Sequence, residues 1–511
     1  MEELLSSSEQ RELKIIHLLY QEEKLWTVEQ LANYLQCSID TCYRYIDRIK
    51  QIFYDHGNEF ELISKKTKGV LLKKTEHASL SKYESIYIEE TIDFKLLSEL
   101  FHSTYLTTEK LADHLFISKS TLYRKLKKIA ILLRKNGIHL NISTLQLTGN
   151  EVWIREFFYL VYWSTSDSGF WPFESVPKHV LTHRVENIIS SQNSYFSTIE
   201  KLKLTYRMAI SFIRVQQKNF ITHSIGDSFI DPFKEEYFEF ITLNLMKTVP
   251  SNYQKNEKDY LSLIFCTYPY LDKSDLNFCG IVSWHSINNT IPYQLTDRLL
   301  SSLSTIYPTQ NLLTNKKLFY QLLCISIYAT YFQASFSKTS EFLKLSTLLK
   351  QTHTCFYLNT KHALATICQE EPFKRILLQP NFYIHSTIIL LSSYVDVLGY
   401  CNEIHVRLIS SHDRISESLL RNELLRHFPE KISITTSAEF NHQTAALHYD
   451  LIITDLLSSV SVDDFSSQYY FWSYPPMKRD WENIATIITT IDQKKHANHF
   501  HESLILKEAP I

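Results

Sequence analysis

Between residues 107 and 129, apolar positions recur at helical spacing in two short blocks. The spacing predicts a first helix capped by Thr107 or Thr108 and a second helix capped by Ser118. The inward-facing positions are Leu111, Ala112 and Leu115 in the first block and Leu122, Leu126 and Ile129 in the second. A short turn at Phe116 and Ile117 joins the two blocks. Two helices joined in this way, with a polar N-terminal end on the second, are typical of a helix-turn-helix.

The same pattern occurs 80 positions earlier in the chain. "TVEQLANYLQCSIDTCYRYIDRI", which begins at Thr27, shares its framework residues with "TTEKLADHLFISKSTLYRKLKKI", which begins at Thr107. The matched pairs are Thr27/Thr107, Glu29/Glu109, Leu31/Leu111, Ala32/Ala112, Leu35/Leu115, Ser38/Ser118, Thr41/Thr121, Tyr43/Tyr123, Arg44/Arg124, Gly57/Gly137 and Gly69/Gly149. A constant offset over so many pairs indicates a duplicated unit.

Each copy continues into a pattern that is typical of a β-hairpin. "FELISKKTKGVLLKK" follows Gly57, and "IHLNISTLQLTGN" follows Gly137. Each segment predicts two strands closed by a turn, which would form the wing of a winged helix-turn-helix. Lys65, Lys66 and Lys68 lie at the predicted tip of the first wing, where they are placed to meet phosphates.

The middle of the chain, from about residue 155 to 400, shows long amphipathic helical patterns and almost no strand signal. Two of these patterns span residues 199–221 and 313–337. Their related cores, "AISFI" and "CISIY", indicate two related helical bundles. The turn-rich segment 166–177 is a link into this region.

The last part of the chain predicts a small α/β domain with a parallel sheet. Strands are expected at residues 403–410, 431–437 and 450–455, and an amphipathic helix at 413–428. That helix is predicted to present Leu419, Leu420, Leu424 and Phe428 to a core. The fold class is therefore mainly α and multidomain, with two winged helix-turn-helix units, two helical-bundle domains and this α/β domain. The predicted boundaries are 1–75, 76–160, 161–285, 286–398 and 399–511.

Charge is segregated along the chain, although the net charge is only −2. After Asp113 no acidic residue occurs until Glu151, and the second helix of the second copy falls in this interval. A basic helix face is often only solvated, but its place in a duplicated helix-turn-helix favours contact with DNA. The predicted DNA-binding residues of this copy are Ser118, Lys119, Ser120, Thr121, Tyr123, Arg124, Lys125, Lys127 and Lys128. Tyr123 either contacts a phosphate or packs inward.

The first copy carries a weaker signal for DNA. Arg44 and Arg48 join the three wing lysines as predicted DNA-binding residues, but Asp40 and Asp47 lie beside them. This copy is therefore alternatively a packing or dimer module.

Composition excludes several classes of function. Only 8 glycines are present, which argues against Gly-rich phosphate loops. The 8 cysteines are scattered without metal or disulfide spacing, as expected for a reduced, cytoplasmic protein. No apolar run long enough for a membrane span and no signal-peptide pattern are found. No catalytic triad, metal motif or nucleotide loop is present, so neither an enzyme nor a bound cofactor is expected.

These features together resemble the Mga/AtxA-type virulence and global transcription regulators of Gram-positive bacteria. The resemblance rests on the N-terminal repeat and, beyond it, on the order of the domains. It implies two phosphotransferase-system (PTS) regulation domains in the middle, in which phosphorylated histidines tune activity. It would set such a histidine in the first helix of each bundle, near Arg207 in the first. No His occurs between His183 and His223 or between His285 and His353, so the possible phosphoacceptors lie elsewhere in the bundles and are His179, His223 and His353.

The C-terminal domain is similar to the IIB domains of sugar phosphotransferase systems. An active IIB domain carries phosphate on a Cys after its first strand, whereas this chain has Ser410, Ser411 and His412 there, and Cys401 lies before the strand. His412 is a possible substitute acceptor. The missing Cys argues against a phosphotransferase enzyme and leaves self-association, as a homodimer or higher homo-oligomer, as the implied role of this domain.

The resulting prediction is a transcription activator that binds double-stranded promoter DNA and is modulated by PTS phosphocarrier proteins. The alternative is an RNA-binding antiterminator under the same control. The duplicated helix-turn-helix favours DNA, because the major groove of duplex DNA admits a helix and that of RNA does not.

Overall fold

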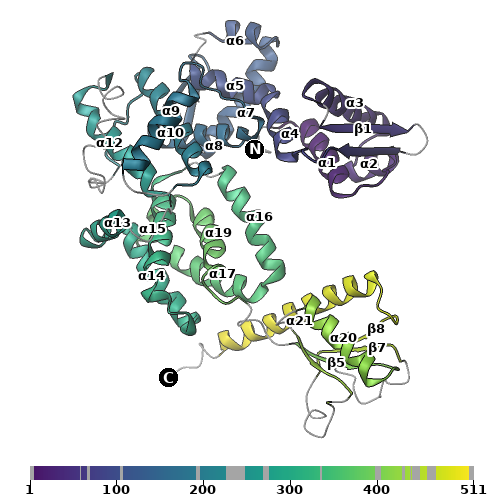
Figure 1. The fold of residues 1–511 in the computed structure, drawn as a ribbon. Coiled ribbons are helices and arrows are strands. Elements are labelled where there is room, and N and C mark those ends of the chain that lie inside the picture. Colours follow the sequence, from purple (N-terminus) through teal and green to yellow (C-terminus); the bar gives the residue numbers. More distant parts are fainter. Residues whose placement is uncertain are drawn as a thin grey trace. The chain divides into compact units, whose positions relative to one another are not determined.

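The computed structural model describes residues 5–57, 59–65, 69–103, 107–191, 196–225, 248–268, 276–333, 336–397, 404–428, 432–437, 439, 449–456 and 468–505 (Figure 1). The chain divides into two compact units. The first holds residues 1–290 and 326–339, and the second holds residues 291–325 and 340–511.

The first unit begins with the first copy of the repeat. Its helices are α1 (Ser7–Gln21), α2 (Val28–Leu35) and α3 (Ile39–Asp55), and its strands are β1 (Phe60–Lys65) and β2 (Gly69–Lys74). Side chains of Ser6, Thr27 and Ser38 cap the three helices. The strands pair antiparallel, so the predicted wing is present. Helix α4 (Leu80–Glu89) follows the wing.

The second copy has the same order of elements. Its helices are α5 (Ile92–His102), α6 (Thr108–His114) and α7 (Lys119–Lys135), and its strands are β3 (Ile138–Asn141) and β4 (Gln146–Gly149). Thr107 caps α6, and Ser118 caps α7, as the pattern predicted. The apolar positions of both blocks are buried except Leu115, which is half-buried. The two copies therefore share one fold.

The remaining described elements of the first unit are helical. They are α8 (Glu151–Trp163), the 3-10 turn η2 (Ser166–Ser168), α9 (Lys178–Ser191), α10 (Thr198–Gln216), α12 (Ser251–Cys266) and α13 (Leu276–Ile287). Helix α8 begins directly after the wing strand β4. The predicted helix at 199–221 is α10, which ends five residues earlier than the pattern suggested.

The second unit contains a helical part and a sheet. Its helical elements are α14 (Ile291–Ile306), η4 (Pro308–Gln310), η5 (Leu312–Thr314), α15 (Lys316–Tyr331), α16 (Phe336–Thr352), α17 (Thr354–Gln369), α18 (Phe373–Ile376) and α19 (Pro380–Leu391). The last turns of α15 and the first turn of α16 belong to the first unit. The single helix predicted at 313–337 is wrong, because η5, α15 and the start of α16 occupy this range as separate elements.

In the described part of the C-terminal region, the sheet has four parallel strands in the order β6-β5-β7-β8. The strands are β5 (Ile404–Ile409), β6 (Ile432–Thr435), β7 (Leu451–Thr454) and β8 (Gln468–Phe471), and the helices are α20 (Arg414–His427) and α21 (Lys478–Ile505). The predicted strands and helix are present, and the structure adds β8 and α21. None of the described helices is long and apolar enough to cross a membrane.

The prediction that Leu419 faces the core of this sheet is wrong. Its side chain is 60% exposed, whereas Leu420 and Leu424 are buried against the strands and Phe428 is partly buried there. Adjacent helical positions are rotated by about 100°, so a helix that buries Leu420 and Leu424 turns Leu419 away.

Candidate nucleic-acid interface

The N-terminal end of α7 is an exposed polar surface. Ser118 accepts a hydrogen bond from the amide of Thr121 at 3.2 Å, which fixes the first turn of the helix. Ser118, Lys119 and Ser120 are exposed, and the first turn carries no acid. The unpaired amides and the partial positive charge at a helix N-terminus favour a phosphate or a base edge there.

A cationic stripe continues along the exposed side of the same helix. Arg124 and Lys127 are exposed on the side opposite the buried leucines of α7. Neither forms an ion pair with another residue that the structure describes. Tyr123 is 42% exposed, and its hydroxyl lies 3.5 Å from that of Thr108. We call Ser118, Lys119, Ser120, Thr121, Arg124 and Lys127 the recognition surface.

One contact at the recognition surface is weak enough for DNA to displace. Lys119 lies 3.2 Å from Glu109 of α6, and both side chains are more than half exposed. Solvent screens an exposed pair of this kind, so it contributes little to stability. A DNA phosphate can therefore replace Glu109 as the partner of Lys119 at little cost.

Lys125 and Lys128 have a different surrounding from the one that the sequence predicted. Their ammonium groups lie 2.5 Å and 2.8 Å from the carboxylate oxygens of Asp93, in the first turn of α5. The Asp93 side chain is only 2% exposed, and that of Lys125 is 18% exposed. Lys128 also donates to the carbonyl of Leu5 at 3.2 Å. These two lysines therefore fasten α7 to α5, and their predicted phosphate contacts stay a prediction.

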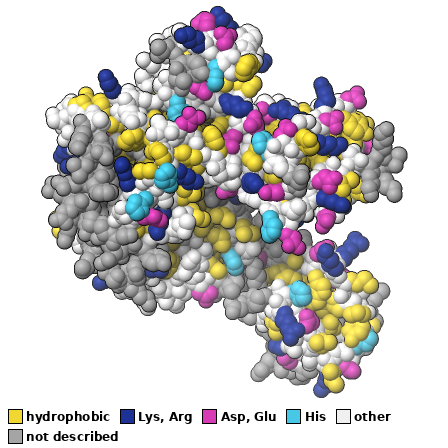
Figure 2. All heavy atoms as spheres, turned by 45° about the horizontal axis from the view of Figure 1, so that its top comes forward, with side chains coloured by type: hydrophobic (Ala, Val, Ile, Leu, Met, Phe, Trp, Pro, Cys, Tyr) yellow, Lys and Arg dark blue, Asp and Glu magenta, His cyan; other side chains and the backbone are white. Residues whose placement is uncertain are grey.

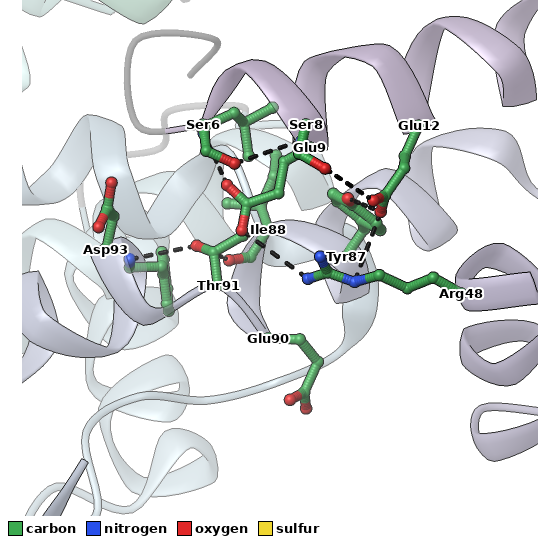
Figure 3. Close-up of polar contacts among 12 residues, drawn as sticks. Ser6, Ser8, Glu9, Glu12, Arg48, Tyr87, Ile88, Glu90, Thr91 and Asp93 are labelled. Carbon is green, nitrogen blue, oxygen red and sulfur yellow. Dashed lines mark hydrogen bonds and ion pairs between the residues drawn. The ribbon is translucent and has the colours of Figure 1, made fainter. Parts of the chain in front are cut away.

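Arg48 shows the same arrangement in the first copy. It stands 80 positions before Lys128, and its guanidinium lies 3.5 Å from Glu12 and 3.9 Å from Glu9 of α1 (Figure 3). In each copy, a cation of the third helix thus reaches an acid of the first helix. Arg48 is thus paired with acids of the first copy itself. Arg44, in contrast, is exposed and donates to the Thr41 hydroxyl at 3.0 Å.

Glu12 also joins the first copy to the helix that follows its wing. It is fully buried and accepts a hydrogen bond from the hydroxyl of Tyr87 in α4 (Figure 3). Burial raises the pKa of Glu12 above its ordinary value. On the same helix, the Tyr83 ring packs edge-on against Phe53 and Phe60. Helix α4 is therefore packed onto the first copy rather than being a loose linker.

The predicted tip of the first wing lies largely outside the described residues. Lys66 and Lys68 are outside them, and so is the side chain of Lys65, although its backbone pairs with Gly69. Gly69 has φ +114, and a Cβ there would lie 2.3 Å from the Trp26 carbonyl oxygen. A glycine is required because the wing strand approaches the Trp26 backbone, with which Val70 forms an isolated bridge.

The predicted phosphoacceptor histidines belong to different parts of the chain. His179, at the start of α9, and His223 are exposed, and His353 is the half-buried N-cap residue of α17. His412 packs on the Tyr474 ring, with 3.8 Å between ring centroids. Arg207, where the resemblance would set a histidine, is 1% exposed and lies 2.7 Å from Glu156 of α8.

The loop after β5 is closed by a carboxylate. Ser411 donates its amide and its hydroxyl to Asp455 at 2.7 and 2.8 Å, and Asp455 follows β7. His412 lies 3.9 Å from the same carboxylate. Asp455 thus binds the Ser411 amide, one of the groups that would hold a phosphate after the first strand, and its own charge opposes an anion there.

Comparison with known proteins agrees with the geometry of the N-terminal region. Residues 76–162 match the Mga helix-turn-helix domain, and residues 11–71 match an HTH domain. The chain carries an Mga helix-turn-helix domain. The predicted resemblance to the Mga/AtxA-type regulators is thereby confirmed at its most specific part, the duplicated helix-turn-helix.

Three relatives extend the similarity beyond this region. The capsule synthesis positive regulator AcpB of Bacillus anthracis is 22% identical over 499 residues, which cover 93% of this chain and 97% of that protein. The anthrax toxin expression trans-acting positive regulator of the same organism is 22% identical over 298 residues, or 58% of each chain. The capsule synthesis positive regulator AcpA, also of Bacillus anthracis, is 25% identical over 207 residues, or 40% of this chain and 42% of that protein. The similarity to AcpB runs through nearly the whole chain.

Sequence reasoning missed the acids that hold the third helices, Glu12 and Asp93. Glu12 is 36 positions from Arg48, and Asp93 is 32 positions from Lys125, so no local period reveals either pair. The available signal was the Thr91 cap, which places Asp93 in the first turn of a helix.

Proposed function

We propose that this protein is a transcription activator that binds double-stranded promoter DNA through the recognition surface of α7. The observation that carries the proposal is the placement of Arg124 and Lys127 on an exposed helix face, beside the polar N-terminal end that Ser118 caps. In a helix-turn-helix this end enters the major groove, and neighbouring cations contact the phosphates. The helix-turn-helix matches support DNA binding, and the positive regulators among the relatives support activation.

The alternative, an RNA-binding antiterminator, is less favoured by this geometry. The deep and narrow major groove of an RNA helix does not admit α7. Competition of duplex DNA against structured RNA for the full-length protein separates the two functions directly.

The principal test is to map the DNA that the protein binds in cells and to measure transcription of the adjacent genes. The double variant Arg124→Ala/Lys127→Ala should lose most bound sites and the associated transcription. The matched control is Lys255→Ala/Lys258→Ala, because this pair has the same spacing and lies on exposed positions of α12. Equal occupancy by the two variants would refute the assignment, and binding without a change in transcription would refute activation.

Self-association through the C-terminal domain is the second part of the proposal. Ile415 and Leu419 lie one turn apart on α20 and are 82% and 60% exposed. Figure 2 shows hydrophobic side chains gathered over this part of the chain. A second copy of the same face would cover them, since most homo-oligomers use a self-complementary patch. The variant Ile415→Asp/Leu419→Asp should lower the mass found by analytical ultracentrifugation, whereas Leu345→Asp/Leu348→Asp on α16 should not.

Modulation by PTS phosphocarrier proteins is the third part of the proposal. It assumes the five predicted domains, two of which would be the regulation domains. Its support is the exposure of His179 and His223 in the region that would form the first regulation domain. A gel that retards phosphohistidine-containing protein tests it, with the double variant His179→Ala/His223→Ala as the control. Absence of retardation in the wild-type protein from cells with an active PTS would exclude phosphohistidine control.

A further inference from the structure

Phe116 is an exposed aromatic residue at the turn of the second helix-turn-helix. Its side chain is 95% exposed, more than any other large hydrophobic side chain in the part of the chain that the structure describes. It lies two positions before Ser118, the cap of α7. An exposed phenylalanine at this place gains nothing from burial in the folded chain.

The backbone at Phe116 is also unfavourable for this residue type. Its φ is +52, in the left-handed region that β-carbon contacts disfavour. Its amide donates to the carbonyl of Asp113, and the next amide, of Ile117, donates to that of Ala112. This pair of hydrogen bonds is the Schellman ending of a helix, with Phe116 at the position that glycine most often occupies.

The first copy uses the same turn with another residue. Gln36, 80 positions earlier, has φ +53, and its amide donates to Asn33 while that of Cys37 donates to Ala32. The turn therefore does not need an aromatic ring. The repeat separates what the fold requires at this position, a left-handed residue, from what only the second copy adds, a phenyl ring.

The surroundings of Phe116 indicate which partner covers the ring. Lys119 and Ser120 follow it at exposed positions, and Arg124 lies one turn further along α7. A ring that precedes exposed cations and hydroxyls in the chain fits the major groove, where phosphates line the edges and the 5-methyl group of thymine is the apolar feature. An apolar protein partner would be expected to meet a broader apolar patch.

We propose that Phe116 is a specificity-determining residue that packs on the 5-methyl group of a thymine in the bound site. The inference rests on the proposed DNA-binding function and deepens it. The left-handed turn, which both copies share, holds the ring at the entrance of the groove while Ser118 and Ser120 reach the base edges. The ring is covered only when DNA is bound.

The test begins with full-length wild-type protein and a pool of random duplex DNA, from which a bound sequence is selected. Each thymine of that sequence is then replaced in turn by uracil, which lacks only the 5-methyl group. One replacement should weaken wild-type binding about fourfold, the change expected for one buried methyl group. Phe116→Gln, which installs the residue of the first copy, should bind the thymine and uracil duplexes equally.

Two further variants separate a DNA contact from an effect on folding. Phe116→Gly should also lose the discrimination, while its melting temperature rises because glycine suits the left-handed position. Phe170→Gln, at another exposed phenylalanine, should keep the wild-type preference. The inference is overturned if Phe116→Gln still prefers thymine or if the wild-type protein prefers no thymine. If the wild-type protein selects no DNA at all, the proposed function itself fails.

Discussion

Lys125 of α7 and Asp93 of α5 form a nearly buried ion pair, with 2.5 Å between the ammonium and a carboxylate oxygen. Lys128 approaches the other oxygen of the same carboxylate at 2.8 Å. The basic helix thus has two kinds of cation. Arg124 and Lys127 face outward, and Lys125 and Lys128 hold the helix in place. A count of basic residues in the sequence does not separate the two kinds.

This division predicts different effects for neighbouring substitutions. Arg124→Ala should weaken binding to a selected duplex and lower the slope of log affinity against log salt by about one, because one phosphate contact is lost. Lys125→Met should leave that slope unchanged, because Lys125 is engaged with Asp93. Fluorescence anisotropy of a labelled duplex over a salt series measures both. Equal reductions of the slope would show that Lys125 contacts DNA.

The same relationship predicts that Asp93 stabilises the position of α7. Asp93→Asn leaves Lys125 and Lys128 without their carboxylate and should destabilise the α5–α7 contact by about 2 kcal/mol. Hydrogen exchange of the full-length protein should show faster exchange of α7 amides. Glu109→Gln removes an exposed pair with Lys119 and should change exchange little. The same exchange rate in Asp93→Asn and the wild type would show that Asp93 does not hold α7 in place.

Local patterns were sufficient for much of the N-terminal fold. The caps at Thr107 and Ser118, both hairpins and the constant offset of 80 each rest on residues that interact with near neighbours in the chain. The first three strands of the C-terminal sheet and α20 were predicted for the same reason. Period and capping act over one or two turns, and the sequence displays them directly.

Contacts between segments that are distant in the sequence could not be predicted from such local patterns. The pairing of Glu12 with Arg48 depends on how α1 and α3 pack, and the sequence of either helix alone permits other partners. The edge strand β8 is short, and its "QYYF" has no clear alternation of buried and exposed residues. The predicted helix at 313–337 followed the amphipathic pattern through Phe332, although α15 ends at Tyr331.

The buried ion pair of Arg207 and Glu156 predicts a large loss of stability when only one of the two charges is removed. The guanidinium lies 2.7 Å from Glu156 and 4.2 Å over the Tyr159 ring, and Tyr328 donates to the same carboxylate at 2.7 Å. Arg207→Met should destabilise the protein by about 3–5 kcal/mol, because a buried carboxylate loses its counter-charge.

The double variant Arg207→Met/Glu156→Gln should recover most of that loss, since no uncompensated charge remains and Tyr328 can still donate to the glutamine carbonyl. Differential scanning calorimetry of the two variants beside the wild type gives the comparison. If the double variant melts as early as the single one, the cost lies in packing around Tyr159 rather than in charge.

His285 of α13 predicts a pH dependence of stability. Its side chain is buried, its Nδ1 lies 2.7 Å from the Thr290 hydroxyl, and burial lowers its pKa to about 4. In the unfolded chain the pKa of a histidine is about 6.5. The unfolded state therefore binds a proton first as the pH falls. The stability that the neutral ring contributes is complete above about pH 6.5 and is lost as the pH falls towards 4.

Between pH 7 and pH 5 this loss amounts to about 2 kcal/mol. His285→Gln keeps a polar partner for Thr290 but does not titrate, so its melting temperature should fall less over this range than that of the wild type. The exposed His223→Gln is the matched control and should follow the wild type. If His285 takes up a proton on unfolding, its removal must flatten the curve of melting temperature against pH. Parallel curves for the wild type and His285→Gln would therefore mean that other groups set the acid sensitivity.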